Sequence, residues 1–175
     1  MPRPFALVPQ LKLDEIDAYK RDVDASLRHY FAQLPPELKQ RLFGKTPSEA
    51  SDELQLRLDE SDTRSSFFVL TSLEASFRID FDYRCTKRLK DELSAYFRDL
   101  QREHGDRIRL DDDILEGWKR YAHAPSALIS ELRRAFKFRH WLAHGRYWAP
   151  KVGRKFDFES VYSMALLVSA FPFET

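Results

Sequence analysis

The residues best suited to chemistry lie near the end of the chain, between Phe136 and Trp148, in the sequence FKFRHWLAHGRYW. This stretch holds two of the five histidines and two of the three tryptophans. An imidazole can accept or donate a proton near neutral pH, and a guanidinium keeps its charge and can stabilise phosphoryl oxygens. His144 and Arg139 therefore form a suitable pair for phosphodiester cleavage. RNA brings its own nucleophile, the 2′-hydroxyl, so such a reaction needs no metal.

The spacing of these residues predicts that they lie at the end of a helix. Residues 126 to 143 contain no proline or glycine and carry apolar residues at helical spacing, and Gly145 is placed to end the helix. His140 and His144 are four positions apart and therefore share a face. Arg139 lies about 140° from His144 around an ideal helix. We expect its long side chain and a loosened last turn to bring the two groups to one patch.

The two histidines also allow simpler interpretations. They can be ordinary core or surface residues, with Trp141 and Leu142 forming the packing face. An H-x3-H spacing is also found among zinc ligands, but the metalloprotease form needs a glutamate directly after the first histidine, where this chain has Trp141. With a single cysteine and no other clustered histidine, we expect neither a metal site nor a cofactor.

The charge of the chain is segregated, although the net charge is only +1. No acidic residue occurs between Glu131 and Asp157, a segment that contains Arg133, Arg134, Lys137, Arg139, Arg146, Lys151, Arg154 and Lys155. Aromatic rings beside basic groups can stack unpaired bases. We therefore expect Arg146, Tyr147, Trp148 and Lys151 to guide an RNA strand. The alternative is a solvated basic face balanced by the acidic residues between positions 49 and 62.

A carboxylate in an apolar stripe is the second feature of interest. The helix expected from about Arg64 has a stripe of Phe67, Leu70, Phe77 and Phe81, and the spacing puts Glu74 in its middle. A buried carboxylate costs several kcal/mol unless it is paired. Arg78, four residues on, is one candidate partner. The other is Arg139 or a motif histidine, whose orientation Glu74 would then fix.

The rest of the chain predicts an all-α bundle of about six helices. Residues 1 to 12 read as an extended arm, because prolines occur at positions 2, 4 and 9, and residues 13 to 175 as one domain. Apolar periodicity predicts helices over residues 13 to 34, 37 to 43, 64 to 104, 113 to 121 and 158 to 170. We expect Asp111 or Asp112 to cap the helix at 113, and Asp157 to cap the last one.

Two details of this prediction depend on length and composition. Residues 44 to 62 are polar and acidic, so we expect a surface linker with one or two helical turns around residues 54 to 58. One helix from 64 to 104 would be about 60 Å long, too long for a compact domain of this size. We therefore expect a break or sharp kink between Tyr83 and Arg88.

Several classes of protein are disfavoured. The single cysteine, Cys85, cannot form an internal disulfide and suits a reducing cytoplasm. No apolar run approaches the length of a membrane span, and the proline-broken start does not resemble a signal peptide. We therefore expect a cytoplasmic protein that does not contact a membrane.

The run from Arg139 to His144, RHWLAH, resembles the R-x4-6-H motif of HEPN domains. HEPN domains are small all-α bundles, and many are metal-independent endoribonucleases of toxin–antitoxin, CRISPR and anti-phage systems. The resemblance implies that Arg139 and His144 are catalytic, that His140 is the polar residue of the motif, and that two protomers form one cleft. Some members carry a tyrosine two residues after the histidine that a partner modifies. Here Tyr147 is three residues after it, so that role is not transferred.

The sequence as a whole therefore predicts a homodimeric endoribonuclease that acts on RNA such as tRNA or mRNA, with a possible antitoxin or regulatory partner. The 2′-oxygen as nucleophile implies products that end in a 2′,3′-cyclic phosphate. The first alternative is a non-catalytic HEPN-like module that binds nucleotide or RNA. The second is a structural protein-interaction domain, in which the segregated charge complements a partner.

Overall fold

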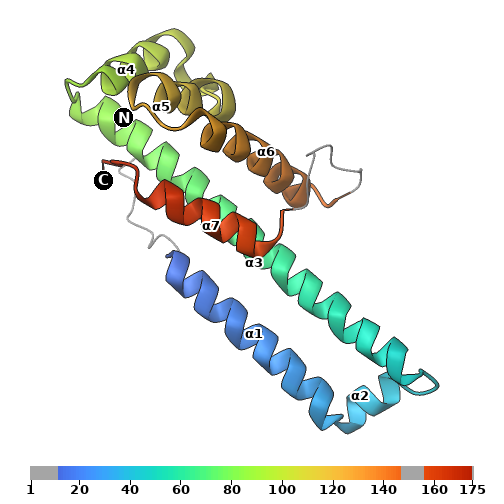
Figure 1. Cartoon of the computed structure of the whole chain (residues 1–175). Helices are drawn as coiled ribbons and strands as arrows, with labels where there is room; N and C mark the ends of the chain where they lie inside the picture. The colour runs from blue at the N-terminus through green and yellow to red at the C-terminus, as the bar shows by residue number, and fades with distance from the viewer. Residues whose placement is uncertain (1–11, 147–155, 175) are drawn as a thin grey trace.

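The computed structural model describes residues 12–146 and 156–174, and these residues form an all-α fold without strands (Figure 1). This confirms the predicted all-α class, with seven α-helices in the described part where about six were expected. The expected extended arm falls on residues 1 to 12, of which only Lys12 is among the described residues. The elements are α1 (Leu13–Gln33), α2 (Pro36–Arg41), α3 (Pro47–Lys87), α4 (Glu92–His104), η1 (Gly105–Arg107), η2 (Leu110–Ile114), α5 (Leu115–Tyr121), α6 (Ser126–Ala143) and α7 (Phe158–Ser169).

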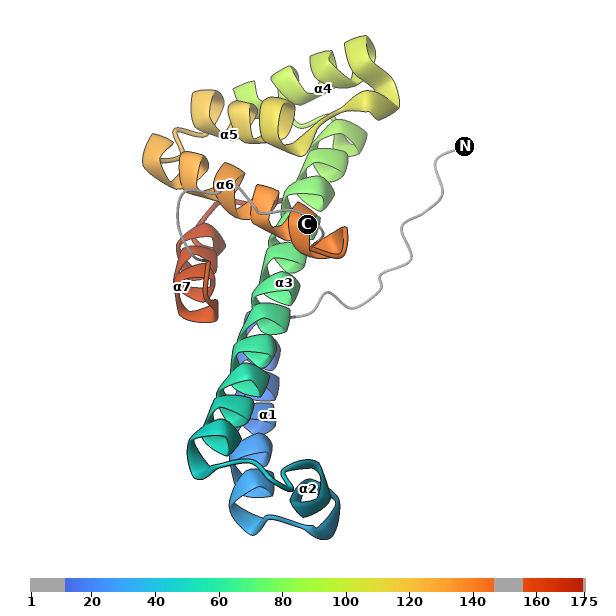
Figure 2. The ribbon, with the colours of Figure 1, turned by 90° about the vertical axis from the view of Figure 1, so that its right-hand side faces the viewer.

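Helix α3 is the element on which the others are arranged. Its 41 residues span about 60 Å; α1 and α7 lie beside it, and α4, α5 and α6 lie across its C-terminal half (Figure 2). The helix begins with a capping box, in which the Thr46 hydroxyl accepts the Glu49 N–H and the Glu49 carboxylate accepts the Thr46 N–H. The prediction of a polar linker over residues 44 to 62 is therefore wrong. Its acidic residues Glu49, Asp52 and Asp59 are exposed on α3, and the half-buried Glu60 pairs with Arg64 at 2.9 Å.

The predicted break between Tyr83 and Arg88 is confirmed, because α3 ends at Lys87. Arg88 adopts a left-handed conformation (φ 52°), and its N–H donates to the carbonyl of Arg84. The length argument behind this prediction is wrong, however, since α3 alone reaches about 60 Å. The helix that follows, α4, is capped by Asp91, whose carboxylate accepts the Ser94 N–H at 3.0 Å.

The N-terminal half of α3 and α1 form an arm that extends beyond the other helices, with α2 at its far end (Figure 2). Along the apolar stripe of α1, Ile16 is buried, whereas Tyr19 is exposed and Leu27 is half-buried. Stripe residues stay accessible because α1 packs mainly against a single helix. A polar contact adds to this packing, since Ser61 of α3 donates to the Asp24 carboxylate of α1 at 2.7 Å.

The main core lies around the C-terminal half of α3, where α4, α5, α6 and α7 meet it. Aromatic rings fill much of this core, as the composition predicts: Phe77 contacts Trp118 edge-on at 5.9 Å between ring centroids, and Phe81 contacts Phe97 at 5.0 Å. Ile114, Leu115 and Trp118 of η2 and α5 are all buried in this core. Within the described residues, no helix has the length and apolar character needed to cross a membrane.

The starts of α7 and α5 test the predicted helix caps. Asp157 caps α7 as predicted, since its carboxylate accepts the Ser160 N–H at 3.0 Å. The expectation that Asp111 or Asp112 caps a helix at residue 113 is wrong. The chain enters α5 through the π-helical turn η2, at whose start the Asp113 carboxylate accepts the Arg109 N–H at 2.7 Å.

Candidate functional site

Helix α6 has the predicted bounds, Ser126–Ala143, and its last turn is closed by three backbone hydrogen bonds. The N–H groups of His144, Gly145 and Arg146 donate to the carbonyls of His140, Leu142 and Trp141, at 3.1, 3.3 and 3.2 Å respectively. Gly145 (φ 80°) and Arg146 (φ 59°) are both left-handed. Such a conformation is unfavourable for a residue with a β-carbon, so the backbone of Arg146 is held in place by this turn.

The two motif histidines lie side by side at the end of α6. Their ring centroids are 4.2 Å apart, with the ring planes inclined by 53°, as expected for residues four positions apart on one helix. Both side chains are exposed. Two imidazoles that can each hold or release a proton are thus within reach of the same ligand.

Arg139 is turned to α3, where its guanidinium forms an ion pair with the carboxylate of Glu74. Burial lowers the pKa of Arg139 from its ordinary value. Its Nε is buried and has no hydrogen-bond acceptor among the described residues. Arg139 thus lies at the boundary between the helix interface and the exposed end of α6.

Glu74 meets both of the cations considered for it. Its carboxylate also accepts a hydrogen bond from the Nε of Arg78 at 2.9 Å, so one carboxylate joins Arg78 and Arg139. The prediction that Glu74 pairs with a cation is confirmed, and the two alternatives occur together. In the stripe around it, Leu70 and Phe77 are buried.

The other members of that stripe are Phe81, which is buried, and Phe67, which is half-buried. Whether Glu74 and Arg78 support catalysis stays a prediction. The contacts establish that the Arg139 guanidinium is bound by Glu74 of α3, while the imidazoles of His140 and His144 lie on the exposed side of α6.

Arg146, predicted to guide RNA, makes a two-pronged contact with Glu60 of α3. Its Nη1 lies 2.7 Å from one carboxylate oxygen and its Nη2 donates to the other at 3.2 Å. The hydrogen bond from Arg146 holds the pKa of Glu60 below its ordinary value; burial opposes this shift and Arg64 adds to it. The other predicted RNA-contacting residues, Tyr147, Trp148 and Lys151, lie outside the described residues.

Sequence reasoning missed Glu60, because it fell in the segment expected to be a linker. One signal was present: Thr46 and Glu49 have the spacing of a capping box, which predicts that a helix starts at residue 47. A continuous helix puts Glu60 about four turns before Glu74, on nearly the same face. Glu74 and Glu60, the carboxylates that pair with Arg139 and Arg146, could thus have been placed on one side of α3.

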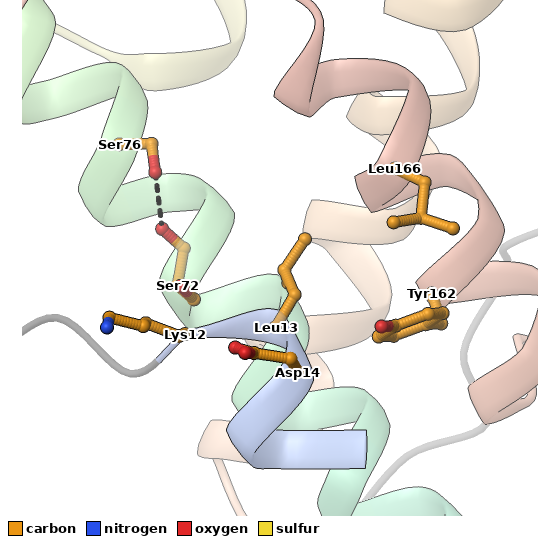
Figure 3. Close-up of a pocket in the computed structure, with 7 residues that line it drawn as sticks. All are labelled: Lys12, Leu13, Asp14, Ser72, Ser76, Tyr162 and Leu166. Atoms are coloured by element: carbon orange, nitrogen blue, oxygen red, sulfur yellow. Dashed lines mark hydrogen bonds between the residues drawn. The ribbon is translucent and has the colours of Figure 1, made fainter. Parts of the chain in front are cut away.

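Other possible sites lie apart from these residues. Among the described residues, no three histidine, cysteine, aspartate or glutamate side chains gather closely enough to hold a metal ion. A groove of about 410 Å³ opens between the start of α1, the middle of α3 and α7 (Figure 3). It is lined by Lys12, Leu13, Asp14, Ser72, Ser76, Tyr162 and Leu166, none of which belongs to the α6 motif.

Comparisons of the chain with models of protein families, with curated proteins and with solved structures find no match in any of the three. The functional interpretation therefore depends on the residues at the end of α6 and on the resemblance of their sequence to the R-x4-6-H motif.

Proposed function

We propose that this chain is a metal-independent endoribonuclease of the HEPN type, which cleaves RNA by attack of the 2′-hydroxyl on the neighbouring phosphate. The observation that carries the proposal is the pair of exposed imidazoles of His140 and His144, whose ring centroids are 4.2 Å apart, on the helix whose Arg139 is bound by a carboxylate of α3. A proton acceptor, a proton donor and a guanidinium are the groups that such a reaction requires.

The reaction uses each group in turn. His144 moves the proton: an imidazole accepts it from the 2′-hydroxyl as the 2′-oxygen forms its bond to phosphorus. The bond from phosphorus to the 5′-oxygen breaks, and an imidazolium protonates the departing oxygen, with His140 assisting. Arg139 stabilises the charge on the phosphoryl oxygens. The products are one RNA end with a 2′,3′-cyclic phosphate and one with a 5′-hydroxyl.

The two-protomer site comes from the resemblance to HEPN domains, in which the motifs of two copies meet in one cleft. Within one chain the Arg139 guanidinium is bound to Glu74 on α3, and the imidazoles face outward. A homodimer with the α6 ends at its interface brings a second copy of each group to the same cleft. Glu74 then acts as a positioning residue, because it fixes the arginine from behind. An antitoxin or another regulatory partner that covers this cleft belongs to the same proposal.

The central test is cleavage of a labelled mixed RNA pool in excess EDTA. We expect cleavage by the wild type, and a loss on the order of 10²- to 10⁴-fold in His144→Ala, since a proton-transfer group contributes about that factor. The matched control is His29→Ala, which removes an exposed histidine of α1 and should cleave like the wild type. Equal cleavage by the wild type and His144→Ala would remove His144 from the mechanism. Ends that carry only a 3′-hydroxyl would indicate a metal-activated water instead.

Three further readouts separate the parts of the proposal. Glu74→Gln should keep the fold, judged by circular dichroism, and lower cleavage; a variant that unfolds would indicate a structural role for Glu74 instead. A monomer in sedimentation that is fully active would contradict the two-protomer site. RNA that is bound in a salt-sensitive way but never cut would indicate the non-catalytic module, and absence of binding would indicate a structural domain.

A further inference from the structure

Two ion pairs join the end of α6 to α3, and they differ in their access to solvent. In the pair of Arg139 with Glu74, the side chains are 21% and 17% exposed. In the pair of Arg146 with Glu60, both are 37% exposed. An exposed ion pair is weak, because water and salt screen it, whereas a partly buried pair is harder to separate. The first pair is therefore suited to hold an arginine in place, and the second to exchange its partner.

The geometry of the second pair resembles that of a guanidinium bound to a phosphate. Both outer nitrogens of Arg146 contact the two carboxylate oxygens of Glu60, at 2.7 and 3.2 Å. A phosphate offers the same fork of two oxygens and binds a guanidinium in the same way. Glu60 thus occupies the face of Arg146 that a phosphate would use.

The neighbouring contacts hold Glu60 and the backbone of Arg146 in place, so the ion pair can form again after such an exchange. Arg64, one turn further along α3, binds the same carboxylate at 2.9 Å, so Glu60 keeps a cationic partner when Arg146 leaves it. On the other side, the left-handed turn holds the backbone of Arg146 through its hydrogen bond to the Trp141 carbonyl. The exchange then needs only a movement of the Arg146 side chain.

We propose that Glu60 competes with the RNA backbone for Arg146. This inference rests on the proposed function. In the free protein the Glu60 carboxylate binds the Arg146 guanidinium. When an RNA strand binds, one of its phosphodiesters displaces the Glu60 carboxylate. A strand already held at the α6 end makes this displacement effectively intramolecular, whereas a mononucleotide must compete from solution. Glu60 thereby weakens the contact of Arg146 with phosphates, and a strand overcomes this competition through its other contacts.

The test measures binding of a fluorescent 2′-O-methyl oligoribonucleotide, which lacks the attacking hydroxyl and stays intact. Four variants are compared with the wild type at one salt concentration: Glu60→Gln, Arg146→Ala, the double variant, and Asp59→Asn. Asp59 is the matched control, because it is exposed, lies one residue earlier and bonds to Gln55 rather than to Arg146. Circular dichroism checks that each variant is folded.

We expect Glu60→Gln to bind about two- to five-fold more tightly, the factor that corresponds to loss of an exposed ion pair. Arg146→Ala should bind more weakly, and the double variant should match Arg146→Ala, because Glu60 acts only through that arginine. Tighter binding by Glu60→Gln than by Asp59→Asn supports a specific contact; equal gains would show a general charge effect and overturn the proposal.

The outcomes also separate this inference from the proposed function. If the wild type binds and cleaves RNA but Glu60→Gln binds no more tightly, only the competition by Glu60 is overturned. If Glu60→Gln tightens binding even without Arg146, the carboxylate acts elsewhere and the inference is again wrong. If neither the wild type nor Glu60→Gln binds RNA, both proposals fail. Binding by Glu60→Gln alone would support the competition in its strongest form.

Discussion

Replacement of the buried Arg84 by methionine should destabilise the protein more than replacement of an arginine on the surface. Arg84 lies in the last turn of α3, and its side chain is 6% exposed while that of Asp80 is 0% exposed. Its Nε donates to both Asp80 oxygens, at 2.8 and 3.0 Å. Its two other nitrogens donate to the Asp91 carboxylate at 3.1 Å and to the Pro172 carbonyl at 2.8 Å. One side chain therefore joins α3, the start of α4 and the C-terminal segment.

The expected loss follows from the charge that would remain. Burial raises the pKa of the Asp80 carboxyl, in opposition to Arg84 and to the backbone N–H of Glu174, so the ionised form depends on these partners. Removal of one member of a buried ion pair costs about 3 to 5 kcal/mol, because the other charge is left uncompensated. For a chain of this size, that loss lowers the melting temperature by roughly 6 to 20 °C.

Urea unfolding followed by circular dichroism measures this loss, with Arg120→Met as the control. Arg120 is exposed and pairs with Glu116 four residues earlier at 2.7 Å, and a solvent-exposed pair of this kind contributes little to stability. The double variant Asp80→Leu with Arg84→Met should recover much of the loss, since no isolated charge remains. A cost for Arg84→Met no larger than that for Arg120→Met would refute the reasoning, as would a double variant less stable than the sum of the single changes.

Two further predictions concern the α4, α5 and α6 region. Gly117→Ala should destabilise the fold by about 1 to 2 kcal/mol in urea unfolding, although alanine favours a helix, because its Cβ would lie 2.6 Å from the buried Phe97 ring; a more stable variant would show that the ring yields. Hydrogen bonds from Arg133 and then Arg120 hold the pKa of Glu116 below its ordinary 4.5. Because the pKa of Glu116 is lower in the folded protein than in the unfolded chain, its ionised carboxylate stabilises the fold at pH values above the unfolded-state pKa. This stability is lost as the pH falls through the folded-state pKa. The stability difference between wild type and Glu116→Gln should thus be present at pH 7 and vanish in acid, and a difference independent of pH would contradict this.

The parts of the fold that were predicted correctly have strong local signals at their ends. Helix α6 begins after Pro125 and ends before Gly145, and α7 begins at the cap Asp157. Proline, glycine and a capping carboxylate determine backbone geometry within a few residues, so they can be identified without knowledge of the tertiary fold. The same holds for the break after Lys87, although the argument that located it was wrong.

The first half of α3 was missed because its stability does not depend on a wide apolar stripe. In the arm it packs mainly against α1, and of its residues before position 66 only Leu58, Ser61 and Ser65 are buried. A helix with one neighbour needs few apolar residues, so its sequence resembles that of a polar linker. The assumption of a compact domain excluded a 60 Å helix, whereas the arm accommodates one.

The candidate site shows the same division between local and distant information. The pairing of Glu74 was predictable, because a carboxylate within an apolar stripe requires a cation wherever the helix is placed. The pairing of Arg146 with Glu60 was not, because these residues are 86 positions apart and meet only through the placement of α6 on α3. Their contact depends on tertiary geometry that no local pattern contains.

That geometry also explains why Gly145 is needed in the candidate site. Glu60 and Glu74 are fourteen residues apart on α3, or about 21 Å, whereas Arg139 and Arg146 would be only about 10 Å apart if α6 continued as a helix. A continued helix would thus leave Arg146 well short of Glu60. The left-handed turn at Gly145 (φ 80°) takes the chain off the helix axis, and the long arginine side chain spans the remaining distance. The glycine that ends α6 is therefore also the residue that allows Arg146 to contact Glu60.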